Sequence, residues 1–155
     1  MSVAVPSTRP KTFTCRTTAE WLSHHGLRFT AGLDKPPLLV MNPPEIDGKA
    51  GEWTPEDLLI GAIETCLAMT FGAYAEKHRL PVEAYYSEAE GLFELEDGAY
   101  RVARVIIRPT IVIESREFST KTLRVLEAAH RDCLVANAVT TSVIVEPSVL
   151  LSASE

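Results

Sequence analysis

One segment, residues 54–75, constrains the fold of this chain more strongly than any other. Thr54 suits a helix cap, Pro55 suits the first helical position, and two acidic residues then meet the positive end of the helix dipole. From residue 58 to residue 75 almost every side chain is apolar or small. We therefore predict one long helix, ending near His78, that other elements must cover on most sides.

A helix of this length and composition could also cross a membrane. Glu64 and two glycines within it, together with the acidic first turn, favour a core helix of a soluble protein. The net charge of −6 gives no basic footprint for nucleic acid or an anionic membrane. The first ten residues lack the layout of a secretory signal. We expect a cytoplasmic protein with a flexible arm at 1–11 and a single domain at 12–155.

The rest of the chain shows the residue alternation typical of short strands, and one further segment has helical periodicity. The predicted elements are strands at 12–22, 27–31 and 38–41, the long helix, strands at 82–95 and 100–114, a helix from 119 to about 133, and a strand at 142–150. This order, βββαββαβ, lacks the regular strand–helix alternation of parallel sheets. It predicts an α+β fold with antiparallel sheets.

The strand at 100–114 shows the clearest alternation. Its two faces are an apolar set and a basic pair, which are Ala103, Val105, Ile107, Ile111 and Ile113 against Arg104 and Arg108. Pro109 lacks the N–H group that a central strand would use, so we expect a bulge or an edge position there.

Three cysteines, Cys15, Cys66 and Cys133, are the candidates for chemistry. An odd number without dense spacing is typical of reduced cytosolic thiols rather than of a disulfide scaffold. Taken alone, a cysteine within an apolar helix is usually a small packing residue. His130 and Cys133, spaced i and i+3, could instead bind a metal with Cys66, although no compact Cys or His cluster supports such a site.

Two of the segments that contain a cysteine resemble a known protein family. The run TPEDLLIGAIETC at 54–66 and the run AHRDCLVANA at 129–138 resemble the OsmC/Ohr family, the osmotically inducible and organic hydroperoxide resistance proteins. The likeness extends from about Thr12 to Val149 and includes the order of the elements. It implies the OsmC-like fold, in which sheets wrap a long buried helix and two chains intertwine as a homodimer.

The activity that this resemblance implies is a thiol peroxidase with no metal or other cofactor. Cys66 matches the peroxidatic cysteine, which attacks an organic hydroperoxide or hydrogen peroxide, and Cys133 matches the resolving cysteine. A sulfenic acid on Cys66 then condenses with Cys133 to a disulfide. A dithiol reductant restores the pair, and the resemblance suggests lipoyl-bearing proteins for this role.

Glu56 matches the carboxylate that orients a cation beside the thiolate in the family. Ten helical residues separate Glu56 from Cys66 by about 15 Å along the axis. One unbroken helix therefore cannot bring both to the same substrate, and Glu56 would serve the partner subunit's Cys66. The alternative is that Glu56 acts only on the helix dipole.

The activating arginine of the family has no direct match. A gap-free alignment of residues 23–29 places His25 at its position. Arg28 lies three residues further, on the opposite face of a regular strand, although a shift at Gly26 would rescue it. A protonated His25 would be a partial substitute, because a low cysteine pKa needs a cation or dipole, while a nearby Glu64 would oppose it.

A second class of function is a dimeric binding protein for a small or acyl ligand, in which the cysteines only pack. Apolar side chains near the long helix are the candidates to line its pocket, namely Trp53, Met69, Phe71 and Tyr74. At helical spacing such residues are more often core. Thiol oxidation by a hydroperoxide discriminates between the two hypotheses.

Overall fold

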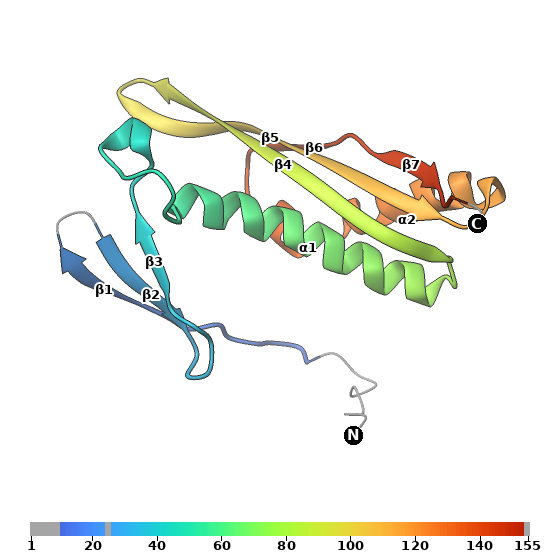
Figure 1. The fold of residues 1–155 in the computed structure, drawn as a ribbon, viewed down its shortest axis with the longest axis horizontal. Coiled ribbons are helices and arrows are strands. Elements are labelled where there is room, and N and C mark those ends of the chain that lie inside the picture. The colour runs from blue at the N-terminus through green and yellow to red at the C-terminus, as the bar shows by residue number, and fades with distance from the viewer. Residues whose placement is uncertain (1–9, 24–25, 154–155) are drawn as a thin grey trace. The chain divides into compact units, whose positions relative to one another are not determined.

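The computed structural model describes residues 10–23 and 26–153. The chain divides into two compact units between Pro55 and Glu56, and each is described by itself (Figure 1). The predicted single domain at 12–155 stays a prediction.

The first unit is an antiparallel meander. Strand β1 (Thr17–Ser23) pairs with β2 (Gly26–Ala31), and β2 pairs with β3 (Leu38–Met41). The three predicted strands are confirmed, although β1 starts five residues later than the alternation suggested. After β3, a loop with a short 3-10 helix, η1 (Pro44–Ile46), returns the chain to β3, where the amide of Met41 bonds to the carbonyl oxygen of Trp53 at 2.8 Å.

The second unit opens with the predicted long helix, α1 (Pro55–Lys77). The helix ends where Arg79 adopts a left-handed conformation (φ 50°) and the amide of Leu80 bonds back to the carbonyl oxygen of Ala75 at 2.8 Å. Such a C-terminal reversal satisfies carbonyl groups that the helix itself leaves unpaired. One face of α1 is buried, through Ile63, Leu67, Phe71 and Ala75.

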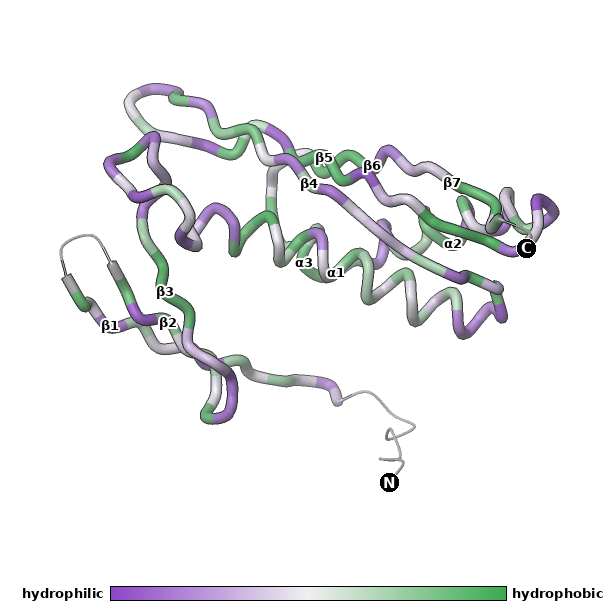
Figure 2. Tube along the Cα trace, in the orientation of Figure 1, coloured by the Kyte–Doolittle hydropathy of each residue, from purple (hydrophilic) through white to green (hydrophobic). Residues whose placement is uncertain are grey.

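The opposite face of α1 is exposed in the single chain, which the sequence alone did not reveal. Its members are small or apolar, namely Ala62, Thr65, Met69, Gly72 and Ala73, and Met69 is 75% exposed. Figure 2 shows hydrophobic residues recurring along the length of this helix. By length and composition α1 also meets the criteria for a membrane span, which is weak evidence because core helices of soluble proteins meet them too.

A long hairpin lies over α1 in Figure 1. Strand β4 (Val82–Glu96) pairs antiparallel with β5 (Ala99–Ile113) across a turn in which Asp97 and Gly98 both have positive φ (51° and 80°). This left-handed pair matches the twist of the flanking strands, as a two-residue hairpin turn requires. The predicted apolar face of β5 is confirmed at Val105, Ile107, Ile111 and Ile113, each 0% exposed, but Ala103 is exposed.

The final predicted strand is two strands, β6 (Ser142–Val145) and β7 (Ser148–Leu151), which both pair with β5 in parallel. The sheet is therefore mixed rather than purely antiparallel. The chain returns to β5 through helices rather than through a hairpin, and such a connection permits the parallel direction.

Pro109 lies inside β5, with β4 on one side and β6 and β7 on the other. The expectation of an edge position was wrong. Strand β6 pairs with residues 104–107 and β7 with residues 110–113, so Pro109 occupies the interval between them. A missing N–H group is tolerated there because no ladder bond is lost.

The second helix, α2 (Ser119–Arg131), follows a 3-10 turn, η2 (Arg116–Phe118), and precedes a short helix, α3 (Leu134–Ala138). Buried residues of α2, including Val125, Leu126 and Ala129, share one core with the buried faces of α1 and β5. Both helices therefore cover the same face of the sheet. This arrangement places the end of α2 beside the middle of α1.

Candidate functional site

Cys66 lies near the middle of α1 and is partly exposed, and its side chain contacts the buried core. It shares one stripe of the helix with Thr70 and Tyr74, at spacings of four residues. The hydroxyl of Thr70 donates to the carbonyl oxygen of Cys66 at 2.8 Å. The helix thus presents the thiol at its surface with a hydroxyl one turn away.

Cys133 occupies the corner between α2 and α3, as the N-cap residue of α3, and is fully buried. Its extended backbone (φ −67°, ψ 112°) breaks the helical path, and its amide bonds to the carbonyl oxygen of His130 at 3.2 Å. Because its side chain does not cap α3, the first amides of that helix have no partner within the helix. These amides are free to bind another acceptor.

The acceptor is the sulfur of Cys66. Burial raises the pKa of the Cys66 thiol, but hydrogen bonds from the amide of Val135, the Cys133 thiol, the Thr70 hydroxyl and the amide of Leu134 outweigh it, so the pKa lies below the ordinary value. The Thr70 hydroxyl has one proton and can donate to one acceptor at a time. It donates to the Cys66 carbonyl oxygen at 2.8 Å while the thiol is neutral, and it can donate to the sulfur once the thiol is ionised.

Cys133 responds in the opposite direction. Burial raises the pKa of its thiol, and the neighbouring Cys66 raises it further, although the amide of Ala136 acts against this. Cys133 is therefore the thiol that keeps its proton, and Cys66 is the thiol that loses it first. Cys66 and Cys133 are thus in hydrogen-bond contact, and both are free cysteines.

Glu56 lies in the first turn of α1, and the helix runs unbroken from there to Cys66. The two side chains are thus about 15 Å apart along the axis and do not meet within one chain. Oxygen Oε2 of Glu56 is shielded from solvent and has no hydrogen-bond partner. A shielded carboxylate oxygen without a donor is unfavourable, so this oxygen has the capacity for one more partner.

Arg28, a candidate for the activating cation, has an ionic partner within its own unit. Arg28 on β2 pairs with Glu20 on β1 through a 3.2 Å contact between Nη1 and Oε2, and both side chains are more than half exposed. His25 lies outside the described residues. Glu64 faces β4, where its Oε1 accepts a 2.6 Å bond from the Ser87 hydroxyl.

The metal alternative finds no support in the described part of the chain. Among residues 10–23 and 26–153, no group of three or more His, Cys, Asp or Glu side chains is arranged to hold a metal ion. Cys15, in the first unit, is exposed.

Sequence reasoning missed the donors to Cys66. The segment 134–138 was predicted as a connection, because five residues are too few to show helical periodicity. Backbone amides also carry no side-chain signal.

The fold and the paired thiols define an α+β protein whose core helix carries a reduced cysteine in contact with a second cysteine at a later corner. More specifically, the chain belongs to the OsmC-like protein family, whose model matches residues 47–148.

Individual proteins agree with this membership. The uncharacterised protein YmaD of Bacillus subtilis (strain 168) is 27% identical over 100 residues, which are 63% of this chain and 67% of YmaD. An OsmC-like protein of unknown function from Vibrio cholerae has a similar structure, with a TM-score of 0.80, 21% identity, and coverage of 88% of this chain and 99% of that one. The structure of an organic hydroperoxide resistance protein OsmC from Legionella pneumophila has a TM-score of 0.71 and 20% identity, and the match covers 91% of this chain and 99% of that one. The two structures share the fold with this chain.

Proposed function

We propose that this protein is a thiol-dependent peroxidase that reduces organic hydroperoxides, and also hydrogen peroxide, through Cys66 and Cys133. The observation that carries the proposal is the contact between the two thiols, with the pKa of Cys66 lowered and that of Cys133 raised. A peroxidatic cysteine must be a thiolate, and a resolving cysteine must lie within reach of it. Structurally similar proteins named for organic hydroperoxide resistance add support.

In the first step the Cys66 thiolate attacks the distal oxygen of the hydroperoxide. The O–O bond breaks, Cys66 becomes a sulfenic acid, and the alkoxide leaves as an alcohol after taking one proton. The amides of Leu134 and Val135 stabilise the thiolate before attack. Partial exposure of Cys66 leaves its sulfur accessible to a substrate.

In the second step the sulfur of Cys133 attacks the Cys66 sulfenic acid, and the hydroxyl leaves as water with the thiol proton. A disulfide between the two cysteines results. An external dithiol then reduces this disulfide and becomes oxidised itself, which returns both cysteines to the thiol form. We propose a lipoyl-bearing protein as the reductant and the cytoplasm as the compartment, since three unpaired cysteines suit a reducing environment.

A homodimer completes this proposal. The exposed apolar face of α1, centred on Met69, is the surface that a second copy would cover. In such a dimer Glu56 of one chain serves Cys66 of the other, because a single unbroken helix keeps them about 15 Å apart. Oε2 of Glu56 has no hydrogen-bond partner within the described part of the chain, which supports the proposal that a donor of the second chain binds it.

The test is the addition of one equivalent of an organic hydroperoxide to the reduced protein. We expect one equivalent of alcohol and an intramolecular disulfide between Cys66 and Cys133, seen by mass spectrometry as a loss of two hydrogens. Survival of both thiols would overturn the peroxidase proposal.

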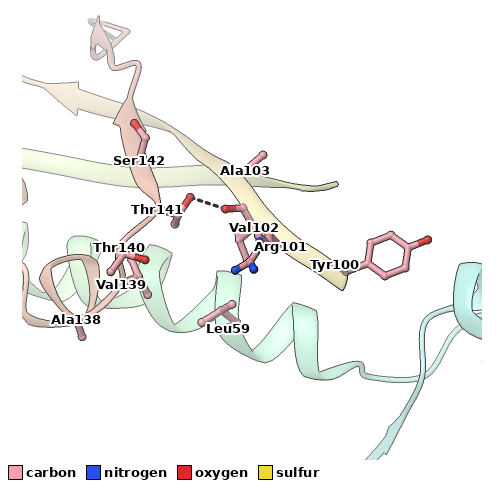
Figure 3. A pocket seen from close by; sticks show the side chains of 10 residues that line it. All are labelled: Leu59, Tyr100, Arg101, Val102, Ala103, Ala138, Val139, Thr140, Thr141 and Ser142. Carbon is pink, nitrogen blue, oxygen red and sulfur yellow. Dashed lines mark hydrogen bonds between the residues drawn. The ribbon is translucent and has the colours of Figure 1, made fainter. Parts of the chain in front are cut away.

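The alternative function is ligand binding without redox chemistry. Of the side chains proposed for a pocket around the helix, Phe71 is core and Tyr74 donates a hydrogen bond to Asp132. A different hollow of about 650 Å³ lies between Leu59, the start of β5 and the segment after α3 (Figure 3). This volume lies within the range of small-molecule sites. Co-purification of an apolar ligand with a protein inert to hydroperoxide would favour this alternative.

A further inference from the structure

The corner that carries Cys133 contacts α1 at two places. One is the Cys66 sulfur, which accepts from Leu134, Val135 and the Cys133 thiol. The other is two turns further along α1, where the hydroxyl of Tyr74 donates to Oδ2 of Asp132 at 2.7 Å. Asp132 immediately precedes Cys133, so the second contact fixes the residue next to the resolving thiol.

The carboxylate of Asp132 is ionised under all ordinary conditions. Hydrogen bonds from Arg131 and then from Tyr74 lower the pKa of Asp132 to about 2. A charged acceptor strengthens the bond from the Tyr74 hydroxyl, because hydrogen bonds to ionised groups are stronger than those between neutral groups. The contact between α1 and the corner is thus charge-assisted.

Arg131 binds the same carboxylate but does not join separate elements. Its Nε lies 2.9 Å from Oδ1 of Asp132, and its terminal nitrogen lies 2.9 Å from Oδ2. The two residues are adjacent, and the Arg131 side chain is 72% exposed. The bond from Tyr74 differs because it spans 58 positions of the sequence and connects α1 to the corner.

The backbone of the corner transmits the position of Asp132 to the thiol. The amide of Asp132 bonds to the carbonyl oxygen of Ala128 at 3.1 Å, and the amide of Asn137 bonds to that of Cys133 at 3.0 Å. The side chain of Asn137 also donates to the carbonyl oxygen of Arg131 at 2.8 Å. These bonds tie the end of α2 and the first turn of α3 into one unit.

We propose that Tyr74 and Asp132 form a positioning pair, which holds the Cys133 corner and the α3 amides against the sulfur of Cys66. The pair does not touch the substrate and acts through the two cysteines. This inference rests on the proposed function for its biological meaning, but its physical content concerns only the approach of two thiols. Loss of the pair loosens the donors to Cys66 and the attack geometry of Cys133 together.

The test replaces Tyr74 with Phe in the full-length protein, which removes one hydroxyl. Alkylation of Cys66 by iodoacetamide across a pH series, read by mass spectrometry, reports its pKa. Glutathione disulfide reports closure, because it oxidises the two thiols to a disulfide while it is reduced to two glutathione molecules. We expect the pKa of Cys66 to rise and closure to slow about tenfold, because small misplacement of reacting groups is costly.

Arg131→Gln is the matched control, because it removes the local ion pair and keeps the bond from Tyr74. We expect it to stay within about twofold of the unmodified protein in both measurements. Asp132→Ala should match Tyr74→Phe, while Asp132→Asn, which keeps an acceptor oxygen, should recover most of the closure rate. This Ala–Asn comparison decides the question even where Tyr74→Phe does not fold.

Two results would overturn the positioning role: Tyr74→Phe and Asp132→Ala that match the unmodified protein, or Arg131→Gln that has the same effect as they do. Both measurements proceed without a hydroperoxide. A protein that fails to consume hydroperoxide would therefore remove the proposed function and leave the positioning test intact.

Discussion

The corner at Cys133 and the meander β1–β3 carry different kinds of hydrogen-bond donor. In the meander, Arg28 is already paired with Glu20 across two strands, at 3.2 Å. In the corner, amides of α3 and the Cys133 thiol donate to Cys66 directly. The comparison teaches that, within the described residues, neutral donors at a helix end lower the pKa of Cys66, in keeping with the expectation that a low cysteine pKa needs a cation or a dipole.

Replacement of Cys66 has the largest expected effect, because it removes the thiol that the corner donors act on and no nucleophile remains. We expect Cys66→Ser to reduce hydroperoxide turnover about a thousandfold or more, measured with a dithiol reductant in excess. Cys15→Ser is the control, because Cys15 is exposed and has no role in the proposed mechanism, and it should keep full activity. Undiminished turnover in Cys66→Ser would be incompatible with the proposed mechanism.

Cys133→Ser separates the two steps that the corner supports. The first oxygen transfer should proceed, because the amides of Leu134 and Val135 remain. The sulfenic acid on Cys66 should then persist and be trapped by dimedone, while steady-state turnover falls about a hundredfold. Normal turnover in this variant would show that another thiol resolves the sulfenic acid.

Glu56→Gln tests whether the carboxylate at the start of α1 contributes to the reaction at Cys66. We expect a roughly tenfold loss of peroxidase rate, because the carboxylate charge no longer orients groups at the site. A mixed dimer of Glu56→Gln and Cys66→Ser chains should regain activity, since one of its two sites then has both residues intact. Equal inactivity of the mixed dimer would place Glu56 and Cys66 in the same chain's site.

Arg28→Ala gives the smallest expected effect. If the α3 amides suffice, the rate of Cys66 oxidation falls by less than about threefold, because an exposed ion pair contributes little. Glu20→Ala, which releases Arg28 from its partner, is the paired variant. A loss of a hundredfold in Arg28→Ala would identify Arg28 as the activating cation of Cys66.

The sequence predicted the fold well where periodicity and caps were strong. The cap signal at Thr54 and the alternation from Val105 to Ile113 carried enough local information to locate their elements. The parallel direction of β6 and β7 was missed, because strand patterns do not encode pairing direction.

The site was predictable only in part, for a related physical reason. Cys66 and Cys133 were identified through their flanking motifs, whereas the donors to Cys66 are backbone groups of Leu134 and Val135. The Tyr74–Asp132 bond joins residues far apart in the sequence and depends on tertiary packing. Such contacts leave no spacing pattern to recognise.

The pH dependence of Cys66 alkylation in the unmodified protein tests the central claim most directly. A lowered pKa means that the thiolate persists to lower pH, so the reactivity of Cys66 should rise through a midpoint below that of a free cysteine thiol, about 8.5. At neutral pH a larger fraction of Cys66 than of free cysteine should therefore be thiolate. A midpoint at or above the free-cysteine value would contradict the account, because the amides of α3 would then not stabilise the thiolate.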